Sequence, residues 1–250
     1  MKKKQKPIHL WSIHLPDHTD EIESCRALLT DEELERASNF FKPSDAERFI
    51  LCRGLLRQIL GEVLSTDPAA LTFERNEHGK PFLTGARQAG KPAPHVEQAF
   101  QPAQCQKRAF QPAQPRTEFN LSHSRDRLLI AVTTGRALGI DIEFRRSGIN
   151  MNAIADRWFA PEEREFFQGL EKPEIGFFDI WAKKEAYVKA LGMGIFKELH
   201  SFAVPLDGEP GFPMIGKTDD WFFQPLEIDP AYAAALVSEA PAVPIHLQML

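Results

Sequence analysis

The 250-residue sequence predicts an α+β fold built from two similar-sized halves, residues 1–137 and 138–250. Strand-like and helix-like segments follow one another in groups and not as regular β-α-β repeats. The expected order is β-α-α-β, then a low-complexity stretch at residues 84–116, then β-β-α-α-β-β. The second group therefore resembles the first in the kind of elements it contains.

The composition limits the classes of function. A net charge of −5 and a pI of about 5.9 give no sign of a surface that binds nucleic acid. The sequence contains no run of about 20 apolar residues, so no membrane span is expected, and its N-terminus lacks the apolar core of a signal peptide. Cys25, Cys52 and Cys105 are too widely spaced for a disulfide framework or a zinc site, which fits a cytoplasmic protein.

The first half begins with a strand and two helices. Alternating apolar residues predict a strand at His9–Leu15. The next helix starts at Thr30, where Glu33 completes a capping box, and it ends near Pro43. A second helix is expected at Ser44–Leu64 because apolar residues recur at helical spacing.

Cations are frequent in the remainder of this half. Arg48, Arg53 and Arg57 lie on a helix that already has a full apolar stripe, so we expect them to be solvated. A short strand is predicted at Leu71–Glu74, followed by a turn that carries cations at Arg75–Phe82.

The low-complexity stretch, Thr84–Arg116, differs in kind from the rest of the chain. It is rich in Gln, Pro and Ala, and the sequence AFQPAQ occurs in it twice, at 99–104 and 109–114. Such a composition buries too little apolar surface to fold, so the stretch is expected to be a disordered surface insertion. A short functional motif within it is the alternative.

One of the strands that follow places two carboxylates on one face. Ordered structure resumes at Glu118–Ser124, and strands are predicted at Leu128–Thr134 and Leu138–Phe144, joined as an antiparallel hairpin through Gly135 and Arg136. In the last of these strands the apolar residues alternate with Asp141 and Glu143. A solvated sheet face would explain this pair if it stood alone.

A helix at Phe178–Leu191, stopped by Gly192, carries two charges within its apolar face. Glu185 and Lys189 project from that face one turn apart, whereas Lys183, Lys184 and Tyr187 fall on the opposite side of the helical wheel. A buried charge needs a partner. The pair is therefore either a structural ion pair or one wall of an active site. The remaining elements are two helices, a loop and two strands, expected at Asn152–Trp158, Pro161–Leu170, Gly194–Val204, Trp221–Leu226 and Tyr232–Val237.

Taken together, Asp141, Glu143 and Glu185 supply three carboxylates near one point. Hard oxygen ligands without cysteine or a convincing histidine suit Mg²⁺ better than zinc. Mg²⁺ that is held by a few carboxylates has room for substrate phosphates.

Four motifs occur in a specific order: GKP at 79–81, FNLSHS at 119–124, GIDIE at 139–143 and WAKKEAYVKALGMGI at 181–195. With this set the chain resembles the 4′-phosphopantetheinyl transferases, in particular the larger pseudo-dimeric type that activates surfactin synthetase. The resemblance implies two α+β halves with the active site between them. It also implies Mg²⁺-dependent transfer of the phosphopantetheine arm from coenzyme A to a serine of an apo acyl or peptidyl carrier protein. A monomer is expected.

The resemblance also implies roles for single residues. Asp141, Glu143 and Glu185 match the metal ligands, and Glu185 and Lys189 match the catalytic pair. Where some relatives have lysines for the 3′-phosphate, this chain has Glu32 and Glu35, and Arg36 or Lys42 is the possible substitute. The residues that match the grip on coenzyme A are Arg48, Arg75, Gly79, Lys80, Pro81, Ser122 and His123.

Two other classes of function stay open at this point. A Mg²⁺-dependent nuclease also combines carboxylates with lysine, but here Glu185 and Lys189 stand four apart on a helix and the net charge is acidic. A non-catalytic module that binds carrier proteins is the second. For a transferase or for a carrier-binding module, the carrier is expected to dock near Gly192–Ser201. The alternative is that some apolar side chains of this segment belong to the core. The sequence does not identify the carrier or say whether acylated coenzyme A is accepted.

Overall fold

The computed structural model describes residues 6–86, 116–193, 199–206, 221–239 and 243–250. Three short 3₁₀ turns, at Leu15–Glu21, Pro68–Ala70 and Leu199–Ser201, join longer elements. The helices and strands of the described chain are β1 (Ile8–His14), α1 (Ile22–Ala27), α2 (Asp31–Ser38), α3 (Pro43–Leu64), β2 (Leu71–Arg75), β3 (Pro81–Ala86), β4 (Thr117–Ser124), β5 (Arg127–Thr134), β6 (Leu138–Phe144), α4 (Met151–Trp158), α5 (Pro161–Gln168), α6 (Pro173–Leu191), β7 (Trp221–Pro225), β8 (Tyr232–Glu239) and β9 (Ile245–Met249).

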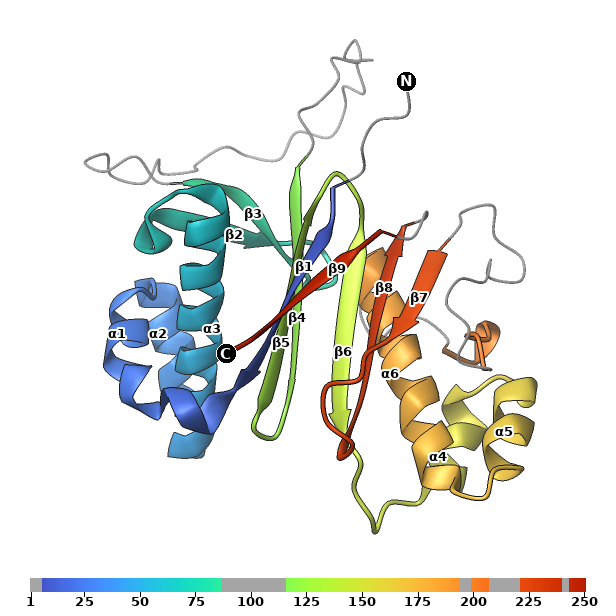
Figure 1. Cartoon of the computed structure of the whole chain (residues 1–250). Coiled ribbons are helices and arrows are strands. Elements are labelled where there is room, and N and C mark those ends of the chain that lie inside the picture. Colours follow the sequence, from blue (N-terminus) through green and yellow to red (C-terminus); the bar gives the residue numbers. More distant parts are fainter. Residues whose placement is uncertain (1–5, 87–115, 194–198, 207–220, 240–242) are drawn as a thin grey trace, which may run out of the picture.

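The two halves lie side by side, with their sheets between two groups of helices (Figure 1). One sheet has the strand order β4-β5-β1-β9 and the helices α1–α3 beside it. The other has the order β6-β8-β7, and α6 packs on it, with α4 and α5 outside. The predicted α+β fold in two halves is confirmed. No helix in the described ranges is long and apolar enough to cross a membrane.

The predicted hairpin between residues 128–134 and 138–144 is wrong. Strand β5 pairs with β4 and β1, and β6 pairs with β8. Side-chain hydrogen bonds, and not a backbone ladder, join β4 to β6. Asn120 accepts a hydrogen bond from the Ile140 N–H (2.9 Å), and Ser124 accepts one from the Phe144 N–H (3.0 Å). Polar side chains of β4 therefore lie directly beside β6, which carries the carboxylates.

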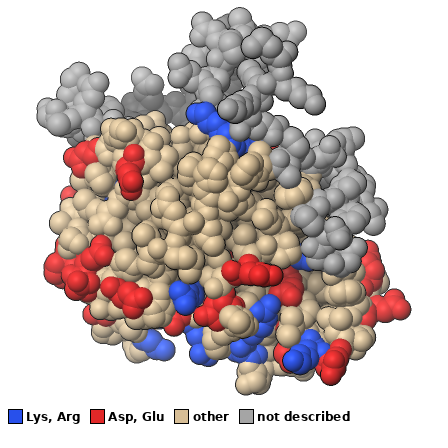
Figure 2. Space-filling model, in the orientation of Figure 1, with Lys and Arg blue, Asp and Glu red and all other residues tan. Residues whose placement is uncertain are grey.

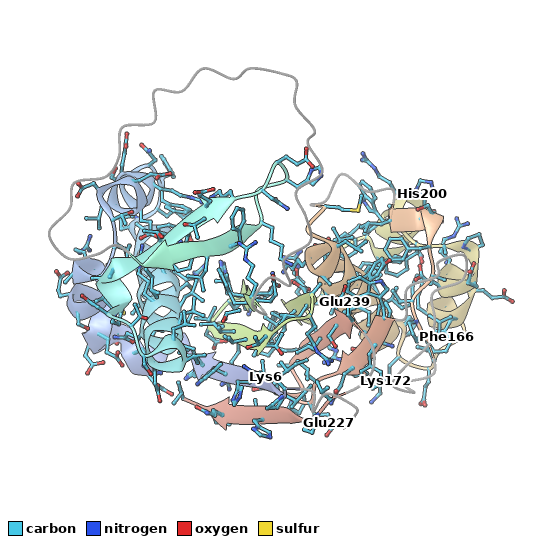
Figure 3. All side chains as sticks on the ribbon, turned by 90° about the horizontal axis from the view of Figure 1, so that it is seen from above. Lys6, Phe166, Lys172, His200, Glu227 and Glu239 are labelled. Atoms are coloured by element: carbon cyan, nitrogen blue, oxygen red, sulfur yellow. The ribbon has the colours of Figure 1, made fainter. Side chains whose placement is uncertain are left out.

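The chain ends on the sheet of the first half. β9 pairs in parallel with β1, from Ile8 opposite Ile245 to Ser12 opposite Met249. This strand had not been predicted. In Figure 2, acidic and basic side chains are intermixed along the lower part of the face, and the middle, over β1 and β9, carries few charges. Viewed from above, Glu239 at the end of β8 lies between the two halves (Figure 3), where it accepts a hydrogen bond from the Ala137 N–H (2.9 Å).

The low-complexity stretch is shorter than predicted. Residues 84–86 belong to β3, which pairs with β2, and β4 begins at Thr117. The intervening residues 87–115, including both copies of AFQPAQ, lie outside the described residues, so the expectation of disorder stays a prediction.

The capping box at the start of α2 is confirmed, and its glutamate does more than cap. Glu33 exchanges hydrogen bonds with Thr30 and also accepts hydrogen bonds from Arg53 (2.9 Å to Nε) and Arg57 (2.8 Å to Nη2). Arg53 and Arg57 are only 8% and 1% exposed, so the expectation that they are solvated is wrong. The apolar stripe of α3 could not reveal this, because their partner belongs to another helix.

The helix α6 is buried on almost every side. Lys184, assigned by the wheel to the side opposite the apolar face, is fully buried and forms an ion pair with Glu163 of α5 at 2.7 Å. Its ammonium also donates to the carbonyls of Leu199 and Phe202. The face that carries Lys184 is thus covered by α5 and by the segment after α6.

A single glycine brings α6 against β6. A Cβ placed on Gly139 would lie 2.0 Å from the Ala186 carbonyl oxygen and 2.3 Å from the Ala190 nitrogen. Both atoms belong to the helix backbone and cannot move independently of it. Gly139 therefore permits the close approach that brings β6 alongside the last turns of α6.

Candidate active site

Three elements meet at one hydrogen-bonded cluster. The Lys189 ammonium of α6 lies 2.5 Å from Oδ1 of Asp141 on β6 and 2.9 Å from Oγ of Ser122 on β4. The Ser122 hydroxyl in turn donates to Asp141 Oδ1 at 2.8 Å. Asp141 is 3% exposed and Ser122 is 7% exposed. The cluster thus joins the halves, with one polar group from each of β4, β6 and α6.

Two more carboxylates belong to the same electrostatic environment. Glu185, one turn before Lys189, is buried, and this burial together with the charges of Asp141 and Glu143 raises its pKa to about 7 although Lys189 opposes the change. Burial and then the Asp141 charge also raise the pKa of Glu143. The ammonium of Lys189 binds Asp141, so the alternative of a simple ion pair between Glu185 and Lys189 does not describe the contacts found.

The donor set fits Mg²⁺, although the ligands do not surround a common point. Among the described residues, no group of three or more His, Cys, Asp or Glu side chains stands close enough to hold a metal ion. Oδ2 of Asp141, however, is buried and has no hydrogen-bond partner, which is a costly state for a carboxylate oxygen. The pKa values of Glu143 and Glu185 are raised first by burial and then by the charge of neighbouring Asp141. A hard divalent cation would relieve both conditions.

The predicted histidine lies next to this cluster. Partial burial of the ring lowers the pKa of His123, and the positive charges of Arg48 and Lys189 lower it further. The negative charge of Asp141 raises it. His123 as a whole residue is nevertheless exposed. Arg48 is 3.4 Å from Asp45 and remains about one-third exposed. Both side chains can therefore face a substrate without leaving the site.

A second group of predicted residues lines a separate cavity of about 400 Å³ between α2, α3 and the β2–β3 pair. Its cations are Arg36, Arg53, Arg57 and Arg75, and its carboxylates are Glu32, Glu33 and Glu74. Burial first, and then repulsion by Arg36 and Arg53, lower the pKa of Arg75. Arg75 also donates a hydrogen bond to the Gly79 carbonyl at 3.2 Å, and Pro81 lines the same cavity. The cavity thus brings four arginines together with three glutamates.

Lys80 occupies a different position. Its ammonium donates to the carbonyls of Leu138 (3.2 Å) and Ala190 (3.3 Å), at the start of β6 and the end of α6. Its predicted contact with coenzyme A stays a prediction. Nothing in the local sequence indicated the observed contacts, because both carbonyls lie more than fifty residues further along the chain.

The expected docking segment, residues 192–201, is described only in part. Residues 194–198, with Ile195 and Phe196, lie outside the described residues. Met193 is 40% exposed, whereas Leu199 is buried in the core of the second half. For Leu199 the core alternative is therefore correct.

Comparison with known proteins gives consistent matches along the chain. Residues 137–237 match the family described as 4′-phosphopantetheinyl transferase superfamily, and residues 16–135 match the family 4′-phosphopantetheinyl transferase, N-terminal. The 4′-phosphopantetheinyl transferase HetI of Nostoc sp. is 36% identical over 76% of this chain and 70% of its own length. The transferase psf-1 of Bacillus pumilus is 30% identical over 92% and 87%, and Sfp of Bacillus subtilis is 26% identical over 94% and 93%.

Proposed function

Because this chain belongs to the 4′-phosphopantetheinyl transferase superfamily, we propose that the cluster of Ser122, Asp141 and Lys189 is its reaction centre. The enzyme transfers phosphopantetheine from coenzyme A to carrier proteins. The observation that carries the assignment is the pairing of Lys189 with one oxygen of Asp141 while the other, buried oxygen has no partner.

The residues of the cluster divide the chemistry among them. Two N–H groups of Lys189 bind Ser122 and Asp141, and the third can donate to the phosphate oxygen that leaves. In the metal-free site Glu185 has a pKa near neutrality, which suits a base that accepts the proton of the carrier serine. Asp141 and Glu143 would hold Mg²⁺, with Glu185 either as the third ligand or as that base. When bound, Mg²⁺ supplies neutralisation of the charge on the pyrophosphate.

The function can be tested by weighing carrier proteins. Apo carriers from fatty-acid, polyketide and non-ribosomal peptide synthesis are incubated with the enzyme, coenzyme A and either Mg²⁺ or EDTA. We expect the mass of at least one carrier to rise by one phosphopantetheine arm with Mg²⁺ only, and a carrier whose acceptor serine is replaced by alanine to gain nothing. Equal transfer in EDTA would contradict the metal assignment. Tight carrier binding without transfer would support the non-catalytic module.

We propose that the cavity beside β2 holds the nucleotide end of coenzyme A. The sequence raised a question at Glu32 and Glu35, where some relatives have lysines. Glu33 is neutralised by Arg53 and Arg57, which leaves Arg36 and Arg75 as the cations available to a phosphate. Arginine is well suited to phosphate because its planar donors can bind two oxygens together.

Replacing Arg75 with methionine should raise the KM for coenzyme A about 10- to 100-fold, the range for losing a hydrogen bond to a charged group. The KM for 3′-dephospho-coenzyme A should hardly change, because that substrate lacks the phosphate. Steady-state kinetics with both substrates measures the difference. Arg26→Met, which removes an exposed arginine paired with Glu23 on α1, is the control. An equal rise for both substrates would place the 3′-phosphate elsewhere.

We also propose that the enzyme works as a monomer in the cytoplasm. Both halves of the site belong to one chain, since Ser122 comes from the first half and Asp141 and Lys189 from the second. Cys25 and Cys52 are free thiols, as is usual in a reducing compartment.

A further inference from the structure

The turn between β2 and β3 contacts the end of the helix that carries Lys189. Asn76 Nδ2 donates a hydrogen bond to the Gly192 carbonyl at 2.7 Å, and the Lys80 ammonium donates to the carbonyls of Ala190 and Leu138. The turn belongs to the first half, whereas the three carbonyls belong to the second.

These contacts satisfy carbonyl groups that the helix itself leaves open. α6 ends with Gly192 in the left-handed conformation (φ +69°), and the N–H groups of Gly192 and Met193 bond to the carbonyls of Lys189 and Val188. This is the usual closure of a helix by glycine, and it satisfies only two of the last carbonyls. Lys80 takes the carbonyl of Ala190. A cation there also interacts favourably with the negative end of the helix dipole.

The turn is built so that Asn76 points in one direction. Its Oδ1 accepts hydrogen bonds from the N–H groups of His78 (3.0 Å) and Lys80 (2.9 Å), and its backbone N–H donates to the Lys80 carbonyl (3.0 Å). With Oδ1 fixed inside the turn, Nδ2 must face outward, toward Gly192. The side chain thus has one end in each half of the molecule.

The two contacted positions on the second half are significant for the reaction. Ala190 follows Lys189 directly, and Leu138 lies three residues before Asp141 on the same strand. Lys80 therefore joins the backbones that carry both partners of the 2.5 Å pair. A change in the distance between α6 and β6 would alter that pair.

We propose that Asn76 and Lys80 are positioning residues, which hold the end of α6 against the start of β6 and so fix Lys189 relative to Asp141. The inference rests on the proposed function of Lys189. It assigns to Lys80 a role through the backbone of α6 in place of a direct contact with coenzyme A. The two roles predict different kinetic changes.

Lys80→Met keeps the aliphatic stem and removes the donor. Asn76→Asp keeps the oxygen that organises the turn and replaces the donor with a carboxylate oxygen, which repels the Gly192 carbonyl. In both variants we expect kcat to fall on the order of 10-fold, the loss of about one hydrogen bond at a site under strict geometric control. The KM for coenzyme A should stay within about twofold. Lys80→Arg should recover most of the rate.

The control variant is Glu77→Ala, which removes an exposed side chain from the same turn and should leave both constants unchanged. Melting curves accompany every assay, which is run well below the lowest midpoint so that each variant is folded. A KM for coenzyme A that rises 10-fold in Lys80→Met with kcat unchanged would overturn the inference and make Lys80 a substrate ligand.

A double-mutant cycle gives the decisive test, because coupled residues are not additive. Lys189→Met alone should lose on the order of 10²-fold in kcat. Adding Lys80→Met should then cost little more, since the residue that it positions is gone. Multiplicative losses would overturn the inference. If Lys80→Met has a normal kcat while Lys189→Met is impaired, only this inference is overturned. If Lys189→Met is fully active, both the proposed function and this inference are overturned.

Discussion

Asp141→Asn should lower kcat by on the order of 10²- to 10³-fold while the protein stays folded. The amide has the shape of the carboxylate and can still accept the hydrogen bond from Ser122. It lacks the charge that balances Lys189, and it removes the oxygen charge at Oδ2, the buried atom without a partner. The rate should therefore be lost together with the affinity for Mg²⁺. The fold should persist because the Lys189 side chain is 29% exposed and can remain hydrated.

Transfer rates measured across a range of Mg²⁺ concentrations, with melting curves, separate these effects. Asp179→Asn is a matched control, since it makes the same replacement on α6 at a residue paired only with Arg145 among the contacts found. Asp141→Asn should need a far higher Mg²⁺ concentration than the wild type for half-maximal transfer, and Asp179→Asn should not. Near-normal transfer by Asp141→Asn would remove this residue from the reaction centre.

Local signals in the sequence predicted most of the elements. The capping box at Thr30 and the glycine after Leu191 fix helix ends through contacts a few residues apart, and both are found as expected. Strand partners are different, because alternation indicates which face is apolar but not which neighbour the strand takes. The pairing of β6 with β8 and of β9 with β1 depends on segments about one hundred or more residues apart.

Buried charges were the other difficulty. A helical wheel assigned Lys184 to a polar face, and a full apolar stripe on α3 led us to expect a solvated Arg57. Glu163 and Glu33 approach these two residues from other helices. The site itself was predicted by motifs, which named the residues without saying how they meet. That Lys189 binds Asp141 and not its helical neighbour Glu185 follows from the close packing at Gly139, which no local pattern reveals.

Glu185→Gln should abolish transfer and yet stabilise the metal-free protein. Glutamine cannot accept the proton of the carrier serine, and loss of a general base costs about 10²- to 10⁴-fold in rate. It also removes one of three neighbouring negative charges. An ordinary structural residue would show the opposite combination, with lost stability and retained activity.

The sign of the stability change follows from the pKa of Glu185. Burial raises this pKa from 4.5 to about 7 in the folded protein, so the ionised form opposes folding. Below pH 4.5 the carboxyl is protonated in both the folded and the unfolded protein, and it does not oppose folding. As the pH rises from 4.5 through 7, the unfolded protein loses this proton more readily than the folded protein does, so stability falls. Removing the carboxylate should therefore raise the free energy of unfolding by about 2–3 kcal/mol at pH 8 and change it little at pH 4.5.

Thermal melting at both pH values, in EDTA and in Mg²⁺, tests this expectation. In EDTA at pH 8 the variant should melt above the wild type, and Mg²⁺ should raise the midpoint of the wild type more than that of the variant. Glu174→Gln, in the exposed first turn of the same helix, serves as the control and should show neither change. If Glu185→Gln melts early at pH 8 and retains transfer, Glu185 stabilises the fold and takes no part in the reaction. A buried carboxylate without a metal ion or another partner destabilises the folded protein, so its removal would not otherwise lower the melting temperature.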